Sequence, residues 1–473
     1  MKFSEMLASQ PPPLSIAGAR LDIRERLLQS KRRLVVIDDA PDDCGAVNDV
    51  SIYLDWSAET LDRALSSDNP VFFLSTDSPA SSREDATRIA QELGRNLSEA
   101  AGKLSANPLI CRGSDSSLRG HFPQEVDALA LGLDWEFDGA IIAPAFFEAG
   151  RYTINDTHWA IQEDELVSMD KTEYARDSVF GFRNSNLKQW VEEKTSGSTR
   201  ADRVRSISLQ CIRNGGPSAV ENELMQTFNG QPVVVNAACC EDLEVFVLGL
   251  IAAETRGKRF MYYCAPSFVK IRGGFLDQPF LTCEQMRPGN GPGLLVAGSS
   301  SDITSRQLQA LIDSKLVVGV ELRVDALLDT DSVEAEIARS SKAVNTRLAE
   351  GDSVALHTPR TRHSISASSF RKLGHTITTG LREVTRRIDI QPGFVISKGR
   401  ITAKEVAGSL GLKEALALGQ VIPGVPVWRL EKADRWAGIP YVIFPGDVGD
   451  DNALVDVFVR CDSVRHSRIL HLR

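Results

Sequence analysis

Two acidic residues, Asp38 and Asp39, come directly after the first predicted strand of the chain, at 34–37. In open α/β sheets ligands bind beyond the carboxyl ends of the strands, so acids in this place face a crevice rather than a core. There they can bind substrate hydroxyls or hold a metal ion. The alternative is that acids after a strand only start a turn or cap a helix, and the pattern leaves both interpretations open.

A denser polar stretch follows the predicted strand at 109–111. It runs from Arg112 to His121 with the sequence RGSDSSLRGH, which holds one carboxylate, three hydroxyls and two guanidinium groups. Arginine pairs with a carboxylate through a two-pronged hydrogen-bonded contact, and Asp and Ser bind hydroxyls. The mixture therefore suits a polyhydroxylated acid, and a purely structural polar loop is the alternative.

A third candidate wall of the same site lies at 143–153, again just past a predicted strand. The sequence there is an apolar turn closed by Glu148 and Arg151. Arg151 can bind an anionic substrate from this position. The alternative is an internal salt bridge between the two residues, and the place of the turn after a strand slightly favours the wall.

Two later segments have the composition of a phosphate-binding loop. The sequence GSSS at 298–301 follows a predicted strand and precedes a helix, and KGRIT at 398–402 repeats this arrangement. A helix N-terminus presents backbone N–H groups to an anion, glycine permits close approach, and Lys398 and Arg400 supply positive charge. Serine-rich helix caps are common, so each segment alone is a weak signal, but two in one domain favour phosphate binding.

The more familiar nucleotide-binding patterns do not occur in the sequence. There is no GxxxxGK[ST] loop, no protein-kinase motif set and no GxSxG elbow with a matching histidine. Glycine turns at 419–426 and 444–450 can admit a flat base or a ribose, with tight turn geometry as the alternative. If ATP binds, we therefore expect a less familiar cradle.

The elements that must position these loops occur in two series. Each series repeats a short β-branched run, a turn and a segment with helical apolar spacing, which is typical of parallel sheets covered by helices on both faces. The expected strands of the first series are 34–37, 71–74, 109–111, 140–143 and 233–236, with helices at 83–104 and 243–255. Those of the second are 294–297, 316–320, 354–357, 394–397 and 441–444, with helices at 305–314, 332–349 and 402–410.

The sequence predicts an α/β fold of two doubly wound three-layer domains facing a central cleft. A Gly/Pro-rich stretch, MRPGNGPG, separates the two series, as expected where few contacts cross a boundary. The expected parts are an N-terminal extension at 1–33, an N-terminal domain at 34–285, a linker at 286–293 and a C-terminal domain at 294–473.

Composition narrows the class of protein. The 473 residues are 42% hydrophobic and 25% charged, with a formal net charge of -9, which fits a globular protein without a general attraction for nucleic acid. The eight cysteines form no CxxC pair, so we expect buried, reduced thiols. The N-terminus has no apolar core of a secretory signal and no apolar run approaches the length that spans a bilayer. We expect no membrane association and a cytoplasmic location.

Taken together, the segments resemble the four-carbon acid sugar kinase family, in the branch that includes 3-oxo-isoapionate kinase and was formerly labelled type III effector-like. The likeness runs in one order over most of the chain, through VVIDDAPDDCGAVNDV, GSDSSLRGHFPQEVDAL, IIAPAFFEAGRYTINDTHW, ARDSVFGFRNSNLKQWVEEKTSG, NAACCEDLEVFVLGL, SKGRITAKEV, GQVIPGVPVWRL and YVIFPGDVGD. The resemblance implies an N-terminal domain that binds a sugar acid and a C-terminal domain that binds ATP, with phosphate transfer across the cleft.

The resemblance also implies particular site residues. For the substrate these are Asp38, Asp39, Ser114, Asp115, Ser116 and Arg119, to which residue chemistry adds Arg112 and Arg151. For the nucleotide they are Ser299, Gly399, Thr402, Gly424, Gly446 and Gly449, to which charge adds Lys398 and Arg400. We expect Asp115 or Asp39 to accept the proton of the attacking hydroxyl and ATP to act with Mg²⁺, whose protein ligands stay unassigned.

Several positions depart from the pattern usual in the family. The Thr-Gly expected after Pro41 is Asp42-Asp43, a glycine is replaced by Arg400, an asparagine by Asp447, and an Arg-Thr-Ala segment by 263–265. These changes leave two hypotheses for function. The first is a kinase for threonate, erythronate, 2-oxo-tetronate, 3-oxo-isoapionate or a related acid, and the second is a weak or inactive relative that senses a sugar acid or nucleotide.

A dehydrogenase is disfavoured, because no GxGxxG follows the first strand of either domain. The expected partners are therefore small molecules, namely the sugar acid and ATP. Whether the protein is a monomer or a homodimer stays open.

Overall fold

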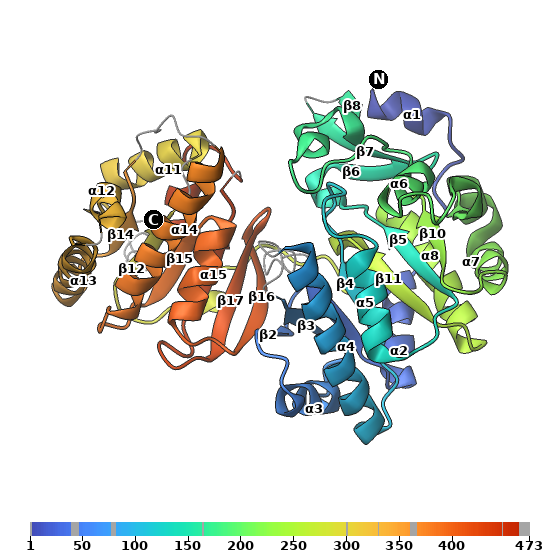
Figure 1. Ribbon diagram of the computed structural model, residues 1–473, viewed down its shortest axis with the longest axis horizontal. Helices are drawn as coiled ribbons and strands as arrows, with labels where there is room; N and C mark the ends of the chain where they lie inside the picture. Colours follow the sequence, from blue (N-terminus) through green and yellow to red (C-terminus); the bar gives the residue numbers. More distant parts are fainter. Residues whose placement is uncertain are drawn as a thin grey trace. The chain divides into compact units, whose positions relative to one another are not determined.

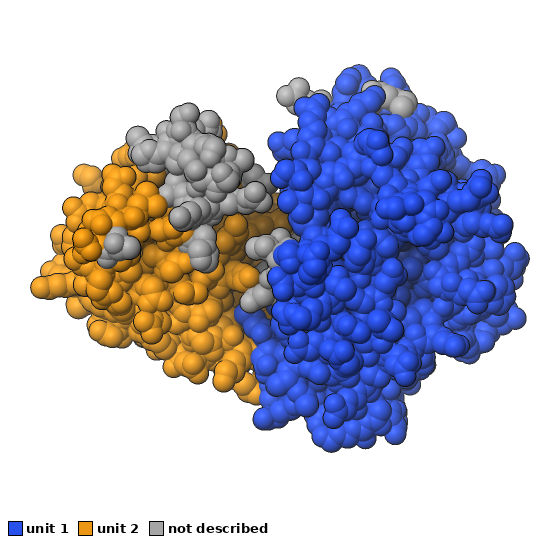
Figure 2. All heavy atoms as spheres, viewed as in Figure 1, with its two compact units in different colours: residues 1–46, 53–277 blue, residues 47–52, 278–473 orange. Residues whose placement is uncertain are grey.

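The computed structural model describes residues 2–38, 47–76, 82–162, 165–298, 301–329, 331–359, 367–446 and 448–462, apart from the side chains of 367–373 and 375. The chain divides into two compact units, coloured separately in Figure 2. The first comprises Met1–Ala46 and Tyr53–Asp277, and the second comprises Val47–Ile52 and Gln278–Arg473. The division lies ahead of the Gly/Pro-rich stretch, and a short piece of the first half of the chain belongs to the second unit.

The main sheet of the first unit is parallel throughout (Figure 1). Its strands follow one another across the sheet in the order β3 (Val71–Ser75), β1 (Leu34–Asp38), β4 (Leu109–Gly113), β11 (Phe260–Cys264), β5 (Gly139–Ala143), β10 (Gln231–Val235) and β9 (Arg205–Ile207). The strands are short, nearly continuous apolar runs, as expected when both faces of a parallel sheet are buried.

Helices cover both faces of this sheet. Those that pack together in one layer are α3 (Ala58–Ser66), α4 (Arg83–Leu104) and α5 (Gln124–Leu133). Those of the other layer are α2 (Ala19–Ser30), α7 (Leu209–Met225), α8 (Cys240–Thr255) and α9 (Pro266–Arg272). The first layer closes a large core in which alternate strand residues such as Val35 and Ile37 meet Leu93 and Leu97 of α4. Because α2 belongs to this arrangement, the N-terminal residues form part of the first unit.

A small antiparallel sheet is added to the first unit. It consists of β6 (Arg151–Ile154), β7 (Thr157–Gln162) and β8 (Glu165–Ser168), and helix α1 (Phe3–Ala8) packs on it. After it come the short helical turns η4 (Met169–Lys171) and η5 (Glu173–Arg176), helix α6 (Leu187–Lys194) and the turn η6 (Ala201–Arg203). The turn η3 (Phe147–Ala149) precedes β6. This sheet has no counterpart among the strands predicted from the sequence.

The sheet of the second unit is parallel for five neighbouring strands and then changes direction. The parallel part runs β13 (Val318–Glu321), β14 (Val354–His357), β12 (Gly293–Ala297), β15 (Phe394–Lys398) and β18 (Pro440–Phe444). An antiparallel hairpin follows, β17 (Val425–Lys432) and β16 (Glu414–Ile422), and β2 (Val50–Tyr53) lies beside β16. The strand β2 thus comes from the first half of the sequence.

The second unit also has a helical layer on each face of its sheet. On one face lie α10 (Cys283–Met286), α11 (Asp302–Asp313) and α16 (Ala453–Cys461). On the other lie α12 (Val324–Leu328), α13 (Val333–Ala349), α14 (Ala367–Arg386) and α15 (Arg400–Ser409). The predicted α/β class with two doubly wound domains is therefore confirmed.

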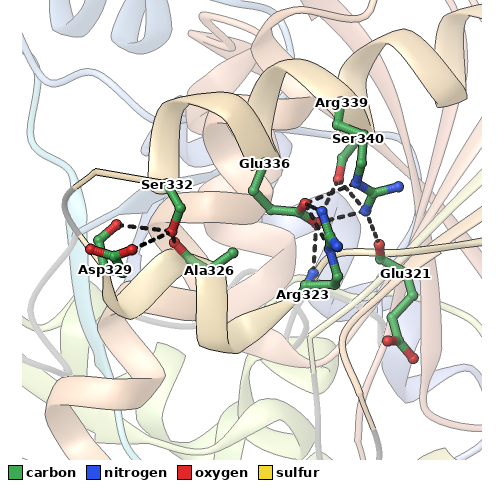
Figure 3. Close-up of polar contacts among 8 residues, drawn as sticks. All are labelled: Glu321, Arg323, Ala326, Asp329, Ser332, Glu336, Arg339 and Ser340. Carbon is green, nitrogen blue, oxygen red and sulfur yellow. Dashed lines mark hydrogen bonds and ion pairs between the residues drawn. The ribbon is translucent and has the colours of Figure 1, made fainter.

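A buried carboxylate joins α12 to α13 in the second unit (Figure 3). The side chain of Glu336 is 1% exposed and accepts hydrogen bonds from the guanidinium groups of Arg323 and Arg339 and from the backbone N–H of Arg323. Burial alone would raise the pKa of Glu336, but the two arginines outweigh it and lower the pKa to about 2. The ion pairs therefore fix how the two helices meet.

Candidate functional site

In the first unit the loops after β1 and β4 begin at the point where the strand order reverses. From β1 the chain crosses to β3 on one side, and from β3 it crosses back to β4 on the other side of β1. Such a switch point opens a crevice at the carboxyl ends of the strands. The predicted substrate residues Asp38 and Ser114 stand at this edge, whereas the predicted Asp39 lies outside the described residues.

The end of β4 makes room for the Asp38 side chain. A Cβ atom on Gly113 would lie 3.0 Å from the Asp38 carboxyl carbon and 3.2 Å from both of its oxygens. The half-buried Asp38 carboxylate thus lies directly against the backbone of β4. Any larger residue at position 113 would push it away.

Asp115, Ser117 and Arg119 form a hydrogen-bonded cluster within the loop after β4. The Asp115 Oδ1 atom accepts from the backbone N–H of Ser117 at 2.7 Å and from its hydroxyl at 2.5 Å. The Asp115 Oδ2 atom accepts from Arg119 Nε at 2.9 Å, and Arg119 Nε also lies 2.9 Å from Ser117 Oγ. Arg119 Nη2 also lies 2.9 Å from Asp115 Oδ2, so both oxygens of Asp115 are engaged by donors of this loop.

Arg112 is held by contacts with β4, β1 and α5. Its guanidinium is buried, pairs with Glu125 of α5 at 2.9 Å and donates to the carbonyl of Gly113 at 2.8 Å and to that of Ile37 at 3.3 Å. These contacts tie β4, β1 and α5 together just below the loop. Arg112 therefore has a structural role below the loop. The substrate contact predicted for it stays a prediction.

Ser114 carries a hydroxyl that no described residue satisfies. Its backbone N–H donates to the carbonyl of Cys264 at 3.0 Å, which fixes the residue beside the end of β11. Its side chain is buried, and among the described residues its Oγ has no hydrogen-bond partner. A buried unpaired hydroxyl is costly unless a ligand or water completes it, so this atom marks a candidate contact for a substrate hydroxyl.

Two guanidinium groups gather at the aromatic ring of Tyr174 in η5. The guanidinium carbon of Arg119 lies 5.0 Å from the ring centroid, and that of Arg151 at the start of β6 lies 5.6 Å from it. Arg151 donates to the carbonyl of Ala149 through one terminal nitrogen, and its buried Nε has no partner in the described part of the chain. Arg119 already pairs with Asp115 and lies 3.9 Å from Asp177. Arg151 is therefore the less engaged cation of the two, and Glu148, its alternative partner, pairs with Lys270 instead.

His158 on β7 connects the small sheet to the same loop. Its ring lies 3.0 Å from Thr153 Oγ1 through Nδ1 and 2.8 Å from the carbonyl oxygen of Ser116 through Nε2. Burial lowers the pKa of His158 to about 4, against the Ser116 contact, which works the other way. The ring is therefore neutral near pH 7, with Nε2–H donating to Ser116 and Nδ1 accepting from the Thr153 hydroxyl.

One departure from the family pattern lies against this loop. Tyr263, at the position where the family pattern has an arginine, is buried near the end of β11, and its hydroxyl would lie 3.1 Å from a Cβ atom on Gly120. Its ring packs against Phe122, with centroids 5.0 Å apart. An aromatic wall thus replaces a cation at this side of the loop.

In the second unit the candidate nucleotide residues follow three strands that end in register. Ala297 of β12 pairs with Lys398 of β15, which pairs with Phe444 of β18. Glycine follows each of the first two strands directly and the third after Pro445. The strand order reverses between β12 and β15, so this edge is again a switch point.

The loop after β15 is tied to the loop after β18. The backbone N–H of Gly399 donates to the carbonyl of Phe444 at 2.8 Å. The fully buried Nζ of Lys398 donates to the carbonyl of Pro445 at 2.6 Å and lies 3.9 Å from the centroid of the Phe444 ring. Gly399, at φ 107°, caps α15, whose first residue, Arg400, has an exposed side chain.

The loops after β12 and β18 meet through two hydroxyls. Ser301 Oγ and Thr304 Oγ1 lie 3.0 Å and 3.1 Å from the carbonyl oxygen of Gly446, to which both donate. Thr402 is packed against the end of β12, since a Cβ atom on Gly298 would lie 2.5 Å from its Oγ1. Among the described residues, the structure thus gathers Gly446 and Thr402 with the ends of β12 and β15, whereas Ser299 and Asp447 lie outside the description.

The two remaining predicted glycines belong to the same edge. Gly424, in the turn between β16 and β17, lies against Val448, because its Cβ would come within 3.6 Å of that side chain. Gly449, at φ 81°, leaves no room for a side chain, since a Cβ would lie 2.4 Å from that of Ala453. The turn of the hairpin and the loop after β18 therefore lie side by side.

Metal binding by protein side chains has no candidate in the described ranges. Within them no group of three or more His, Cys, Asp or Glu side chains is arranged to hold an ion. Magnesium in kinases is held largely by phosphate oxygens and water with one or two carboxylates, which such a search does not detect. Across the same ranges, no helix is long and apolar enough to cross a membrane.

His158 and Tyr174 contact the candidate loop, and sequence reasoning did not single them out. His158 lies 42 positions from Ser116 in the chain, and Tyr174 reaches Arg119 only because η5 follows the small sheet. A histidine inside the alternating strand THWAIQ was the available signal for the first. No comparable signal marked Tyr174.

Comparisons with known proteins agree with both units. Residues 24–272 match the family described as a sugar-binding N-terminal domain, and residues 294–454 match the family described as a nucleotide-binding C-terminal domain. A D-erythronate kinase of Heliobacterium modesticaldum is 26% identical over 281 residues, which are 58% of this chain and 57% of that protein. The chain thus matches little more than half of the length of that relative.

Solved structures share the fold. A Salmonella typhimurium LT2 protein described as a tRNA synthase superposes with a TM-score of 0.67 at 15% identity, over 91% of this chain and 99% of that one. A Haemophilus influenzae protein of the DUF1537 family superposes with a TM-score of 0.63 at 16% identity, over 90% of this chain and all of that one, 100%. With a sugar-binding and a nucleotide-binding domain in this order, the chain belongs to the four-carbon acid sugar kinase family.

Proposed function

We propose that this chain is a kinase that transfers the γ-phosphate of ATP to a hydroxyl of a small sugar acid. The acids that fit are four-carbon acids such as threonate, erythronate or 2-oxo-tetronate, and the branched 3-oxo-isoapionate. The observation that carries the proposal is the loop after β4. There the buried Ser114 hydroxyl, which has no partner among the described residues, adjoins the cluster of Asp115, Ser117 and Arg119 in a domain of the sugar-binding family.

In the first unit the proposed substrate contacts divide by chemistry. Arg119 and Arg151, which both lie at the Tyr174 ring, pair with the carboxylate of the acid. Asp38 and Ser114 bind its hydroxyls, and Asp39 and Ser116 complete the set proposed for the substrate. Arg112 supports the loop through Glu125, and its predicted contact with the substrate remains part of the proposal.

In the second unit the proposed contacts are those of a phosphate cradle. The backbone N–H groups at the start of α15 face the phosphates, with Ser299, Gly399 and Thr402 as proposed contacts and Arg400 as a nearby charge. The glycine backbones at 424, 446 and 449 accept the base or ribose. Lys398 acts through Pro445, whose carbonyl it holds.

The proposed reaction is an in-line displacement. The attacking hydroxyl oxygen of the acid forms a bond to the γ-phosphorus while the bond from that phosphorus to the β,γ-bridging oxygen breaks, and ADP leaves with Mg²⁺ offsetting its charge. The hydroxyl proton passes to a carboxylate, for which Asp39 and Asp115 are the candidates. Both oxygens of Asp115 already accept hydrogen bonds, from Ser117 and Arg119.

The test is an ADP-release assay with the purified protein, ATP and Mg²⁺ over a panel of four-carbon and branched five-carbon acids. Turnover with at least one acid supports the proposal, and the preferred acid defines the substrate. The variant Asp115→Asn is expected to lower kcat by about 100-fold or more with little change in melting temperature. The control Asp85→Asn, at the exposed start of α4, is expected to match the wild type.

A second candidate function is a protein that binds sugar acid or nucleotide without turnover. The burial of Lys398 Nζ against Phe444 and Pro445 favours it, because in this arrangement the amino group is held by protein groups. Calorimetry with ATP and Mg²⁺ distinguishes the two functions. Binding without ADP release for any acid in the panel supports the binding protein and contradicts the kinase.

Cellular location and assembly also belong to this proposal. We propose a cytoplasmic protein whose partners are the sugar acid and ATP, with neither nucleic acid nor membrane as a partner. A homodimer is compatible with the fold. Light scattering of the purified chain gives the oligomeric state directly.

A further inference from the structure

The two faces of the small antiparallel sheet have different chemistry. Because side chains alternate along a strand, Arg151, Thr153 and His158 share one face, with Thr153 directly opposite His158. Tyr152 and Ile154 lie on the opposite face and pack against α1. One face is thus an apolar surface covered by the N-terminal helix, and the other carries polar groups.

The polar face is anchored to the main domain at Thr153. The backbone N–H of Thr153 donates to the carbonyl of Ala237 at 3.0 Å, and the N–H of Ala237 donates back to the Thr153 carbonyl at 2.9 Å. Both Thr153 and His158 are fully buried. The histidine ring is therefore held in place, because backbone hydrogen bonds fix the neighbouring strand and the Thr153 hydroxyl contacts Nδ1 of the ring.

From this base the ring reaches the centre of the substrate loop. His158 Nε2–H donates to the Ser116 carbonyl at 2.8 Å, although the two residues are 42 positions apart in the chain. Ser116 lies between Asp115 and Ser117, whose mutual contacts organise Arg119. The loop turns sharply just beyond this point, where Leu118 has a φ of 65° and its N–H donates to the Asp115 carbonyl at 2.9 Å.

We propose that His158 is a positioning residue for the sugar acid: its hydrogen bond to the Ser116 carbonyl holds the loop of Ser114, Asp115 and Arg119 in the conformation that binds substrate. The inference rests on the proposed function, because it assigns His158 to the site of that reaction. The ring itself contacts no reacting atom. Its effect comes from removing freedom that the loop would otherwise lose on binding, which lowers the cost of association.

Three variants separate positioning from a merely structural role. His158→Phe keeps a flat ring of similar size and removes both nitrogens, so the Ser116 carbonyl loses its donor. His158→Gln places an amide N–H near the position of Nε2 and restores that donor. The matched control is Trp159→Phe, the next residue on β7 but on the opposite face, which loses a hydrogen bond to the Ile154 carbonyl.

The first measurement is steady-state kinetics with the acid that the wild type prefers. His158→Phe is expected to raise the KM for the acid by about 10-fold to 100-fold while leaving the KM for ATP within about twofold. His158→Gln is expected to recover most of the loss. Trp159→Phe is expected to keep both KM values even where its melting temperature falls. Equal KM values for the acid in His158→Phe and wild type would overturn the proposal.

The second measurement does not need turnover. Hydrogen exchange of the peptide 113–121, without substrate, is expected to be faster in His158→Phe than in the wild type and to return toward the wild-type rate in His158→Gln. If the wild type phosphorylates no acid but this pattern appears, the proposed reaction fails while the hold of His158 on the loop stands. If exchange is the same in all three proteins, that hold is disproved whatever the kinetics.

Discussion

Ser114 is the residue at which a substitution should separate the effect on stability from the effect on the proposed function most clearly. Its hydroxyl is buried without a described partner, so it contributes nothing to the folded protein that would offset its desolvation. In contrast, the hydroxyl of Ser117, three positions along the same loop, bonds to Asp115 and Arg119. Two serines of one loop should therefore respond differently to the same substitution.

We predict that Ser114→Ala raises the free energy of unfolding slightly, or leaves it unchanged, while it raises the KM for the sugar acid about tenfold. Ser117→Ala is the control. It is expected to lower stability by about 1 kcal/mol, because Asp115 and Arg119 each lose a hydrogen bond. Thermal unfolding and steady-state kinetics of both variants give the two quantities. A destabilised Ser114→Ala with an unchanged KM would make this hydroxyl a structural group.

His158 predicts a pH dependence of stability. Its ring, which faces Thr153, the Ser116 carbonyl and the charges of Arg151 and Asp115, has a pKa of about 4 in the folded chain. The pKa of histidine in an unfolded chain is about 6.5. Between these values the unfolded chain binds a proton that the folded chain does not, so stability is complete above pH 6.5 and falls as the pH is lowered toward 4.

The loss over this window is on the order of 3 kcal/mol for one such group. Denaturant unfolding between pH 7 and pH 4 is expected to show a shallower decline in His158→Gln than in the wild type, by the equivalent of about one proton. Other acidic and basic groups titrate alike in both proteins and cancel in the comparison. If the unfolding free energies of the two proteins fell in parallel with pH, the imidazole would take up its proton in the folded chain over the same pH range as in the unfolded chain.

Sequence reasoning singled out the candidate loop after β4, but not the residues that support it. Polar residues after an apolar strand are visible in one dimension, and that pattern identified the segment of Ser114 and Arg119. The contacts of His158 and Tyr174 depend on segments that meet only after folding. For Arg112, nothing in the sequence indicated the buried ion pair with Glu125 that the structure shows.

At the scale of elements, the ion pairs between α12 and α13 give a defined energetic contribution. Glu336 is buried between two arginines, whereas Glu350 at the end of α13 is 52% exposed and pairs with Arg347 at the surface. A neighbouring surface pair of this kind typically contributes well under 1 kcal/mol. Substituting each glutamate in turn therefore compares a buried with an exposed ion pair at the same helix.

We predict that Glu336→Gln destabilises the region of α12 and α13 by on the order of 2 kcal/mol at pH 7, and Glu350→Gln by less than about 0.5 kcal/mol. The direction in which stability changes with pH follows from the lowered pKa of Glu336. Glu336 contributes its stability above the unfolded pKa near 4.5, and the contribution is lost as the pH falls toward 2. Hydrogen exchange of peptides from both helices at pH 7 and at lower pH measures this difference. Equal effects of the two substitutions would contradict the buried ion-pair network.

Elements with strong periodicity were predictable, and short irregular ones were not. The helix at 83–104 and the strand at 354–357 have the bounds that the sequence predicts, because their apolar spacing is unambiguous. The strand expected at 316–320 is β13, Val318–Glu321, since its edge position leaves part of it exposed. The small sheet was missed because its strands are short, with only one face in the main core.

At the scale of the whole molecule, no sequence pattern predicts that β2 belongs to the second unit. Residues 47–52 follow the first strand of the chain, yet the backbone N–H of Asp49 donates to the carbonyl of Ala417 at 2.8 Å and β2 lies beside β16. Val50 and Ile52 are buried. A nucleotide-binding domain cut from the chain at residue 278 would therefore lack a strand of its own sheet and leave β16 with an open edge.

We predict that the fragment 278–473 is less stable than the same fragment with residues 47–53 attached through a flexible Gly/Ser linker. The attached strand covers β16 and buries Val50 and Ile52, so the melting temperature is expected to rise by at least about 3 °C. A linked fragment with both residues changed to Asp keeps the length and removes the apolar contact, and it should melt like the bare fragment. Equal melting temperatures for all three fragments would mean that the second unit does not need β2. Calorimetry measures whether the linked fragment and the bare one differ in ATP binding. If only the linked fragment binds ATP, then β2, which comes from the first half of the chain, is required for the fold that binds the nucleotide.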